Sequence, residues 1–329
     1  MKPLIIRENK AKYSNFEKTR LRKNLKGSLE LNNFPYLISF YDEGYTIAHF
    51  VCLAEYKKYR SSINEGVKVV LSVLYAEEDC EGRIFSRQNE NNYVIEKSYI
   101  ELINEVDLVL VPSNEAKVLL EKFGVKKTIK ILSPSVNVTK FSIANTYVKN
   151  IAYRYLKCPE DMQFIISIFD HQDIEAAKKI RLLAEHFPKL KFIGVYHCGM
   201  VPPKLKKIIK KPLSNLIFTQ PLDEDIYVSL AYNAKAYLFL GSSPGNVIEC
   251  YEAMASETQI IALKSSIFTD IIIDKENGYV YNDFASLEDG LRDFVTNKLE
   301  STIEREKEIA KNNSLKVVGE KLIQIYNDL

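Results

Sequence analysis

The 329-residue sequence is poor in the residues that mark several protein classes. It has no Trp, only four His, and five Cys that are odd in number, widely spaced and never in a CxxC pair. This cysteine pattern favours a reducing cytoplasm and argues against a disulfide framework or a structural zinc site. None of the histidines lies in an HExxH or HxH motif, which argues against a zinc hydrolase. We therefore expect no metal site.

Long apolar runs are also missing. No stretch of about eighteen apolar residues occurs, so the sequence predicts no transmembrane helix. The apolar part of the opening segment, MKPLIIRENKAKYSN, is too short for the core of a signal peptide. With 46% hydrophobic and 27% charged residues, and no internal repeat, the composition is that of a globular protein rather than a disordered or fibrous one. We expect a cytoplasmic protein.

The formal net charge of +2 is small, but the positive charge is concentrated in two segments. Residues 7–26 hold eight basic residues and two acidic ones, a local charge of +6. Residues 186–222 hold seven lysines and no acidic residue, a local charge of +7. The remainder of the chain therefore carries −11, so the sequence predicts two basic patches on an acidic body.

Both basic segments resemble amphipathic helices. Within Glu17–Leu29, Leu21, Leu25 and Leu29 recur at four-residue spacing with cations between them, and Pro202–Pro212 places isoleucines among lysines. Such helices bind anionic membrane surfaces, although solvated helix faces have the same pattern. Neither segment has the interleaved aromatics of a nucleic-acid site, so we expect no nucleic-acid partner. The candidate membrane-surface residues are Arg20, Arg22, Lys23, Lys26, Lys206, Lys207, Lys210 and Lys211.

Short β-branched runs alternate with longer helical patterns along the chain, which is typical of parallel sheets covered by helices on both faces. The predicted strands form two sets, separated by a strandless stretch around Asn145–Glu160. The sequence thus predicts an α/β protein with two facing, doubly wound, Rossmann-like domains. We expect an acceptor-side domain at residues 1–147, a donor domain at 148–312 and a closing helix at 313–329 that packs back toward the first domain. Ligands of such sheets bind at the carboxyl ends of the strands.

The segment Leu238–Leu263 holds the strongest candidate site. A strand ends in the loop Gly241–Asn246, and a helix begins at about Asn246. Free backbone N–H groups at a helix start favour an anion such as a diphosphate. Glu249 and Glu252 are three residues apart and so share one helix face, where a carboxylate can bind ribose hydroxyls. The alternative is an ordinary strand–helix turn with a solvated pair of glutamates.

The stretch EAMASETQIIALKSS resembles a signature of retaining GT-B glycosyltransferases of family 4, the glycosyl transferases group 1. VDLVLVPSNEAKVLLEKFGV, ILSPSVNVTKF and DKENGYVY resemble further segments of that family in the family's order. YAEEDCEGRIF resembles a segment of bacterial glycolipid synthases that form diglycosyldiacylglycerol.

The resemblance implies transfer of a hexose from a UDP-sugar, with retention and without a metal or cofactor. The acceptor would be a glycolipid or another cell-envelope molecule at the inner face of the cell membrane. Glu252 would hold the ribose, with Glu249 in that role if the helix is shifted. The candidate donor-binding residues are Ser243, Gly245, Asn246, Val247, Glu249, Glu252, His171 and Lys178, and Lys179 is the alternative to Lys178 as the cation.

Two acceptor-side candidates come from the first half of the chain. The acidic cluster containing Glu78 and Asp79 follows a strand and is placed at the cleft edge, although such clusters are often solvated loops. His49 ends the strand YTIAHF, where the family often has a polar residue. A lone histidine on an apolar strand is more often a hydrogen-bonded core residue, and that alternative stays open.

Four features that the family uses for catalysis are changed here. Pro244 replaces the first acid of the Glu-x7-Glu motif, Asp173 lies near the place of a diphosphate-binding cation, and Leu74 replaces a histidine. The N-terminal glycine loop is absent, since the matching region reads KYSNFEKTRLRKN. A carboxylate beside a diphosphate opposes the charge that develops there. Two interpretations therefore remain: a divergent transferase, and a catalytically silent GT-B subunit that binds an acceptor or a partner glycosyltransferase.

Overall fold

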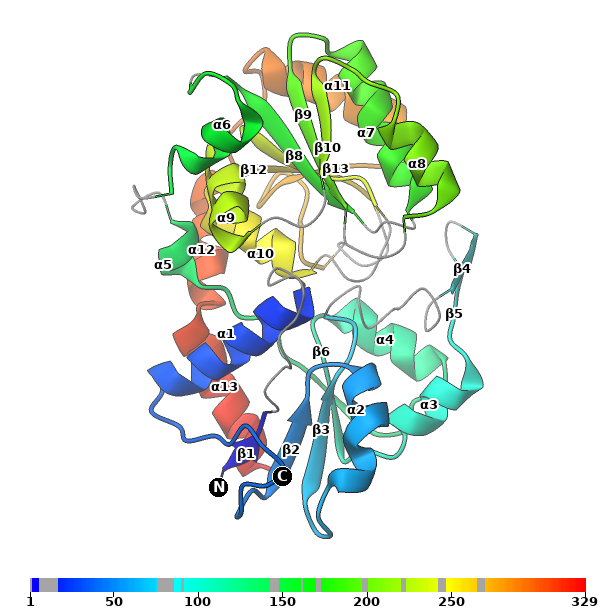
Figure 1. Cartoon of the computed structure of the whole chain (residues 1–329), viewed down its shortest axis with the longest axis vertical. Coiled ribbons are helices and arrows are strands. Elements are labelled where there is room, and N and C mark those ends of the chain that lie inside the picture. The colour runs from blue at the N-terminus through cyan, green and yellow to red at the C-terminus, as the bar shows by residue number, and fades with distance from the viewer. Residues whose placement is uncertain are drawn as a thin grey trace.

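The computed structural model describes residues 2–5, 17–75, 86–89, 92–142, 148–160, 162–169, 173–196, 201–219, 223–241, 247–264 and 270–329. It has two lobes, and each is built on its own parallel sheet (Figure 1). The N-terminal half of the chain forms the lower lobe in this view, and most of the C-terminal half forms the upper one. The final helix is an exception, because it returns to the lower lobe.

The first sheet has five parallel strands in the order β1-β2-β3-β6-β7. Its central strands read IAHF, KVVLS and LVLV and are almost wholly buried, as expected for strands covered by helices on both faces. The strands are β1 (Pro3–Leu4), β2 (Ile47–Phe50), β3 (Lys68–Ser72), β6 (Leu108–Val111) and β7 (Thr128–Ile131). The helices of this lobe are α1 (Glu17–Leu31), α2 (Leu53–Tyr59), η1 (Arg60–Ser62), α3 (Lys97–Ile103) and α4 (Asn114–Lys122), and a small hairpin joins β4 (Ser86–Asn89) to β5 (Asn92–Val94).

The second sheet has six parallel strands in the order β10-β9-β8-β11-β12-β13. The order reverses between β8 and β11, and such a switch point is where open α/β sheets place their ligands. Its strands are β8 (Phe164–Phe169), β9 (Lys191–Tyr196), β10 (Leu216–Thr219), β11 (Ala236–Phe239), β12 (Gln259–Leu263) and β13 (Tyr279–Tyr281). Its helices are α6 (Ile151–Leu156), α7 (Ile174–His186), α8 (Pro203–Ile209), α9 (Glu224–Asn233), α10 (Val247–Ala255), α11 (Phe284–Val295) and α12 (Ile303–Asn312).

Helix α13 (Leu315–Asn327) follows α12 and packs along α1, while α5 (Val138–Phe141) lies between the two sheets in sequence. Val136 and Leu315 are joined through backbone hydrogen bonds, from Val136 N to Asn313 O and from Leu315 N to Val136 O. At Gly319 the two helices are so close that a Cβ would overlap the backbone carbonyl of Ser28. Glycine is therefore needed at this position of α13.

The predicted fold class is confirmed: two parallel α/β domains of Rossmann type form the chain. The predicted alternation of strands and helices, in two sets along the chain, recurs as the two sheets. Sequence patterns did not reveal the short helix α2 or the β4–β5 hairpin, since both are too short to show a hydrophobic period. In the part of the chain that the structure describes, no helix is long and apolar enough to span a membrane.

Candidate functional site

Helix α10 begins beyond the carboxyl end of β11 and carries the two predicted donor-site glutamates. Every residue of β11 and α10 is buried, and Val247 packs in the core of the second domain. The loop predicted to bind the diphosphate, including Ser243, Gly245 and Asn246, lies outside the described residues. The first turns of α10 are therefore the described part of the candidate donor site.

Both glutamates of α10 contact an arginine from the first domain. Arg20 on α1 forms an ion pair with Glu249 through Nη2, and its Nε lies 3.0 Å from Oε1 of Glu252. The two carboxylates are 0% and 1% exposed, and Arg20 is 5% exposed. The contact therefore joins the two domains through charges that water barely reaches.

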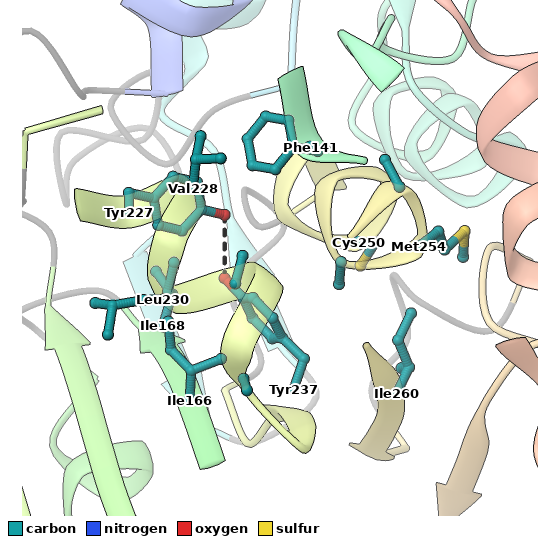
Figure 2. Close-up of a cluster of buried hydrophobic side chains, with 14 of the residues drawn as sticks. Phe141, Ile166, Ile168, Tyr227, Val228, Leu230, Tyr237, Cys250, Met254 and Ile260 are labelled. Carbon is teal, nitrogen blue, oxygen red and sulfur yellow. Dashed lines mark hydrogen bonds between the residues drawn. The ribbon is translucent and has the colours of Figure 1, made fainter. Parts of the chain in front are cut away.

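Two tyrosines complete this cluster, and Figure 2 shows the hydrogen bond between their hydroxyls. The hydroxyl of Tyr227 on α9 donates to Oε2 of Glu252 at 2.7 Å and lies 3.3 Å from the hydroxyl of Tyr237 on β11. The guanidinium carbon of Arg20 lies 5.1 Å from the centroid of the Tyr227 ring, a cation–π distance. We call Arg20, Tyr227, Tyr237, Glu249 and Glu252 the arginine cluster. Both oxygens of Glu252 are thus in contact with groups of the protein itself.

The arginine cluster has two carboxylates and one guanidinium, so full ionisation would leave a buried negative charge. Burial raises the pKa of Glu252 to about 7, because Glu249 adds to the effect and Arg20 only partly opposes it. Burial also raises the pKa of Tyr227 and of Tyr237 well above the usual value. Glu252 therefore binds a proton more readily than an exposed glutamate does.

Neither arginine of the predicted membrane-binding helix is on the surface, which corrects the prediction for Arg20 and Arg22. Arg22 is 4% exposed and pairs with Glu55 on α2. Leu21, Leu25 and Leu29 pack in the core with α13 and the first sheet. The apolar stripe of α1 thus faces the core, and the arginines beside it turn to acids on neighbouring elements.

The lysines of α1 remain closer to solvent. Lys23 donates to Glu224 at 2.8 Å, and Lys140 on α5 reaches the same carboxylate at 2.9 Å. Burial would raise the pKa of Glu224, but hydrogen bonds from the two lysines give a net lowering. Lys26 lies 5.9 Å over the ring of Tyr36. A cavity of about 230 Å³ opens beside the arginine cluster, lined by Arg20, Lys23, Asn24, Gly27, Asn137, Lys140, Phe141, Glu224, Glu252 and Leu315.

The carboxylate of Asp173, at the start of α7, lies beside Gly241, the residue that begins the predicted diphosphate loop. Asp173 caps α7 by accepting from Ala176 N at 2.9 Å, and its carboxylate lies 3.0 Å from where a Cβ on Gly241 would be. Lys178, the predicted cation, instead donates to Glu175 and is half exposed. Lys179 points toward the end of β11 and donates to Leu240 O at 3.4 Å. Of the two lysines, Lys179 therefore contacts the chain at the end of β11 and Lys178 contacts its own helix. His171 lies outside the described residues.

His49 is a buried core residue, so the structure supports the hydrogen-bonded core alternative and not the acceptor-side one. Its Nδ1 lies 2.6 Å from the Tyr326 hydroxyl, and its Nε2 lies 2.9 Å from Oγ of Ser72. Burial lowers its pKa to about 3, so the ring is neutral. The other acceptor-side candidates, Glu78 and Asp79, lie outside the described residues.

The second basic segment does lie on the surface. Leu205 anchors α8 in the core of the second domain, while the lysines around it are exposed. Among the exposed lysines are Lys206, Lys207, Lys210 and Lys211. None of these four forms an ion pair with a residue that the structure describes. The guanidinium of Arg181 on α7 donates to the carbonyls of Ile208 and Lys211 and so fixes the end of this helix. We call these four lysines the α8 lysine patch.

Sequence reasoning missed Arg20 as a site residue, and it missed Tyr227 and Tyr237. Arg20 was assigned to a surface because its neighbours form a basic amphipathic pattern, and that pattern does not reveal which charges find a partner. Tyr227 lies in EDIYVSLAYN, where no motif sets it apart from other core tyrosines. Only the packing of α1 against α9 and α10 reveals the cluster.

Two domains built on parallel α/β sheets, which meet at helix α10, are the architecture of the GT-B fold. Within it, residues 171–315 match the model of the family Glycosyl transferases group 1. No curated protein sequence matches the chain.

The chain is similar to many solved structures, among them the following three. HepE (Alr3699) of Anabaena, in complex with UDP and glucose, has a TM-score of 0.74 at 12% identity, with all of both chains covered. Sucrose-phosphate synthase of Thermosynechococcus elongatus has a TM-score of 0.65 at 14% identity, covering 87% of this chain and 74% of its own. The GtfA/B complex has a TM-score of 0.55 at 14% identity, covering 86% of this chain and 57% of its own. At these identities the similarity establishes the GT-B fold.

Proposed function

We propose that this protein transfers a hexose from a UDP-sugar, with retention and without a metal, to a glycolipid or another cell-envelope acceptor. The observation that carries the proposal is the position of Glu249 and Glu252 on α10, just beyond the carboxyl end of β11 and at the boundary of the two domains. That is where a carboxylate can meet the ribose of a nucleotide bound at the switch point of the second sheet. The match of residues 171–315 to the glycosyl transferases group 1, and the UDP and glucose bound to HepE, support the same donor class.

The donor-binding roles follow from this placement. We assign Glu252 as the ribose ligand and the backbone N–H of Val247, in the first turn of α10, as a ligand of the diphosphate. The assignment of Ser243, Gly245 and Asn246 to the diphosphate stays a prediction from the sequence. In this proposal Lys179 is the cation that binds the diphosphate, a role that the glycosyl transferases give to a residue closer to the end of the preceding strand. Lys179 suits this role because its ammonium group donates to the carbonyl of Leu240, just after β11. Stabilisation of the leaving diphosphate then rests on these N–H groups and this one lysine, which is electrostatic catalysis without an ion.

The proposed membrane attachment rests mainly on the α8 lysine patch, because Arg20 and Arg22 of α1 are buried and Lys23 is paired with Glu224. Four exposed lysines near one another attract anionic lipid headgroups, at about 1 kcal/mol for each lysine near the surface. A lipid acceptor would then be presented to a protein that is held at the inner face of the cell membrane.

The test is a transfer assay with a panel of radiolabelled UDP-hexoses and membrane lipid extracts as acceptors. We expect one donor to be turned over, and Glu252→Gln to lower kcat/KM about ten- to hundred-fold through loss of a charged hydrogen bond to the ribose. Glu304→Gln is the matched control, since this glutamate is 89% exposed on α12 and far from the site in sequence. Failure of calorimetry to detect binding of any common UDP-sugar would overturn the proposal.

A second candidate function is a catalytically silent GT-B subunit that binds an acceptor or a partner glycosyltransferase. The observation that favours it is the carboxylate of Asp173 beside Gly241, where it opposes a bound diphosphate. The similarity to the GtfA/B complex fits a protein that acts as one member of a pair. If the protein is a silent subunit, neither the wild type nor Asp173→Asn should bind UDP. If it is a divergent transferase, Asp173→Asn should bind UDP more tightly than the wild type does.

A further inference from the structure

The guanidinium of Arg20 contacts the carboxylate of Glu252, the group that the proposed function assigns to the ribose. Its Nε lies 3.0 Å from Oε1, while Tyr227 donates to Oε2 at 2.7 Å. The carboxylate is 1% exposed. A ribose hydroxyl therefore reaches Glu252 only if the guanidinium moves away from it.

Arg20 is held in this position by its own helix. Leu21, Leu25 and Leu29 fix α1 in the core of the first domain, and α13 covers it. Asn24, one turn along, donates to the carbonyl of Ser135 at 2.6 Å. The side chain thus reaches Glu249 and Glu252 from a rigid helix, so its withdrawal requires a change of side-chain conformation or a separation of the domains.

We propose that Arg20 is an interdomain gate that competes with the nucleotide for Glu252, so that the donor site opens only when α1 releases α10. This inference rests on the proposed function, because it takes Glu252 as the ribose ligand. The apparent donor affinity is then reduced by the fraction of molecules in which the gate is closed. Release also frees a guanidinium beside a site that lacks the family's usual cation.

Two other roles for Arg20 make different predictions. If Arg20 gripped the diphosphate, its removal would weaken UDP and leave uridine unaffected, because uridine has no phosphate. If Arg20 were only a structural ion pair, its removal would lower stability and leave the affinity for both ligands unchanged. If Arg20 is a gate, its removal strengthens the binding of both uridine and UDP, because both ligands carry the ribose.

The experiment measures uridine and UDP binding by calorimetry for the wild type and for Arg20→Gln. We expect both dissociation constants to fall about tenfold, since a gate that is closed nine times in ten has that effect. Arg22→Gln is the matched control: it removes a buried cation from the same helix, but one that pairs with Glu55 inside the first domain. Its dissociation constants should equal those of the wild type.

Removal of Arg20 leaves two buried carboxylates without their cation, which destabilises the fold. The double variant Arg20→Met with Glu249→Gln removes one charge of each sign and leaves Glu252 with Tyr227. It should show the same gain in affinity if Arg20→Gln fails to fold. In the wild type, hydrogen exchange provides a measurement without substitution: saturating UDP should speed amide exchange in residues 20–24 if the gate opens.

The outcomes separate the two proposals. Unchanged or weaker uridine binding in the folded Arg20 variants, with UDP binding in the wild type, would overturn the gate and leave the proposed function standing. Slower exchange at residues 20–24 on UDP binding would also count against the gate, because it would show that α1 is held more firmly when the nucleotide is bound. Absence of UDP binding in the wild type and all variants would overturn both. Binding only in the Arg20 variants would support the gate and would overturn the proposed activity of the wild type.

Discussion

The Nδ1 atom of His49 on β2 lies 2.6 Å from the hydroxyl oxygen of Tyr326 on α13, and 277 residues separate the two in the chain. Their rings meet edge to face with centroids 5.9 Å apart. Because both side chains are fully buried, this contact ties the last helix of the chain into the core of the first domain. The stability of the first domain should therefore depend on a residue near the C-terminus.

Tyr326→Phe should lower the free energy of unfolding by about 1–3 kcal/mol, because it leaves a ring nitrogen of His49 buried without its partner. Urea denaturation followed by circular dichroism measures this change. Tyr41→Phe is the control, since Tyr41 is 96% exposed and its loss of a hydroxyl should change little. An equal stability of the Tyr326→Phe variant and the wild type would contradict the assignment of this hydrogen bond.

Gly319→Ala should destabilise the protein by about 1–3 kcal/mol, although alanine is the better helix former by about 1 kcal/mol. The added Cβ would overlap the backbone carbonyl of Ser28, which cannot rotate away as a flexible side chain can. Thermal unfolding of Glu320→Ala, at the next and exposed position of α13, gives the comparison. If Gly319→Ala instead raised the melting temperature, the close packing of α13 on α1 would be refuted.

The stability of the Glu306→Gln variant relative to the wild type should increase as the pH rises from 5 to 8. Burial raises the pKa of Glu306 to about 8, well above its ordinary value of 4.5, against the opposing hydrogen bond from Thr302. Between these two values the unfolded chain gives up a proton that the folded protein retains, so wild-type stability falls with rising pH by up to about 1.4 kcal/mol per pH unit. Glutamine has no such proton.

Melting temperatures of wild type and Glu306→Gln across pH 5–9 test this. The difference between them should be small near pH 5, grow through pH 8 and then level off. Glu304→Gln, at an exposed position of the same helix, should show no such trend. A difference that is constant with pH would show that Glu306 does not titrate in this range.

Binding to anionic vesicles should depend on the α8 lysine patch. Replacing Lys206, Lys207, Lys210 and Lys211 with Gln should weaken flotation with phosphatidylserine vesicles at least about tenfold at low salt, because each lysine near the surface contributes about 1 kcal/mol. The control makes the same charge change at four exposed lysines elsewhere, namely Lys97, Lys122, Lys126 and Lys275. Equal loss in both variants would mean that net charge, rather than this patch, governs the attraction.

The candidate site was predicted unevenly, and the reason is the range of the interactions involved. Glu249 and Glu252 were found because three-residue spacing on a helix puts both on one face, which is a local property. Arg20 was misplaced for a related reason: spacing identified an amphipathic helix but not what covers it. For His49 the sequence left two alternatives, an acceptor-side residue and a core residue. Its two buried hydrogen bonds, to Tyr326 and Ser72, show that it is a core residue.

The sequence by itself determined the two parallel α/β domains, since near-continuous apolar strands and amphipathic helices follow from the order of neighbouring residues. It also located α10 at the end of a strand. Only the tertiary structure decided which charges are neutralised. Arg20 meets Glu249 across 229 residues of chain, while the lysines of α8 have no acidic partner among the described residues. Burying a charge costs several kcal/mol unless an opposite charge is near, and the fold alone determines which charges are brought together.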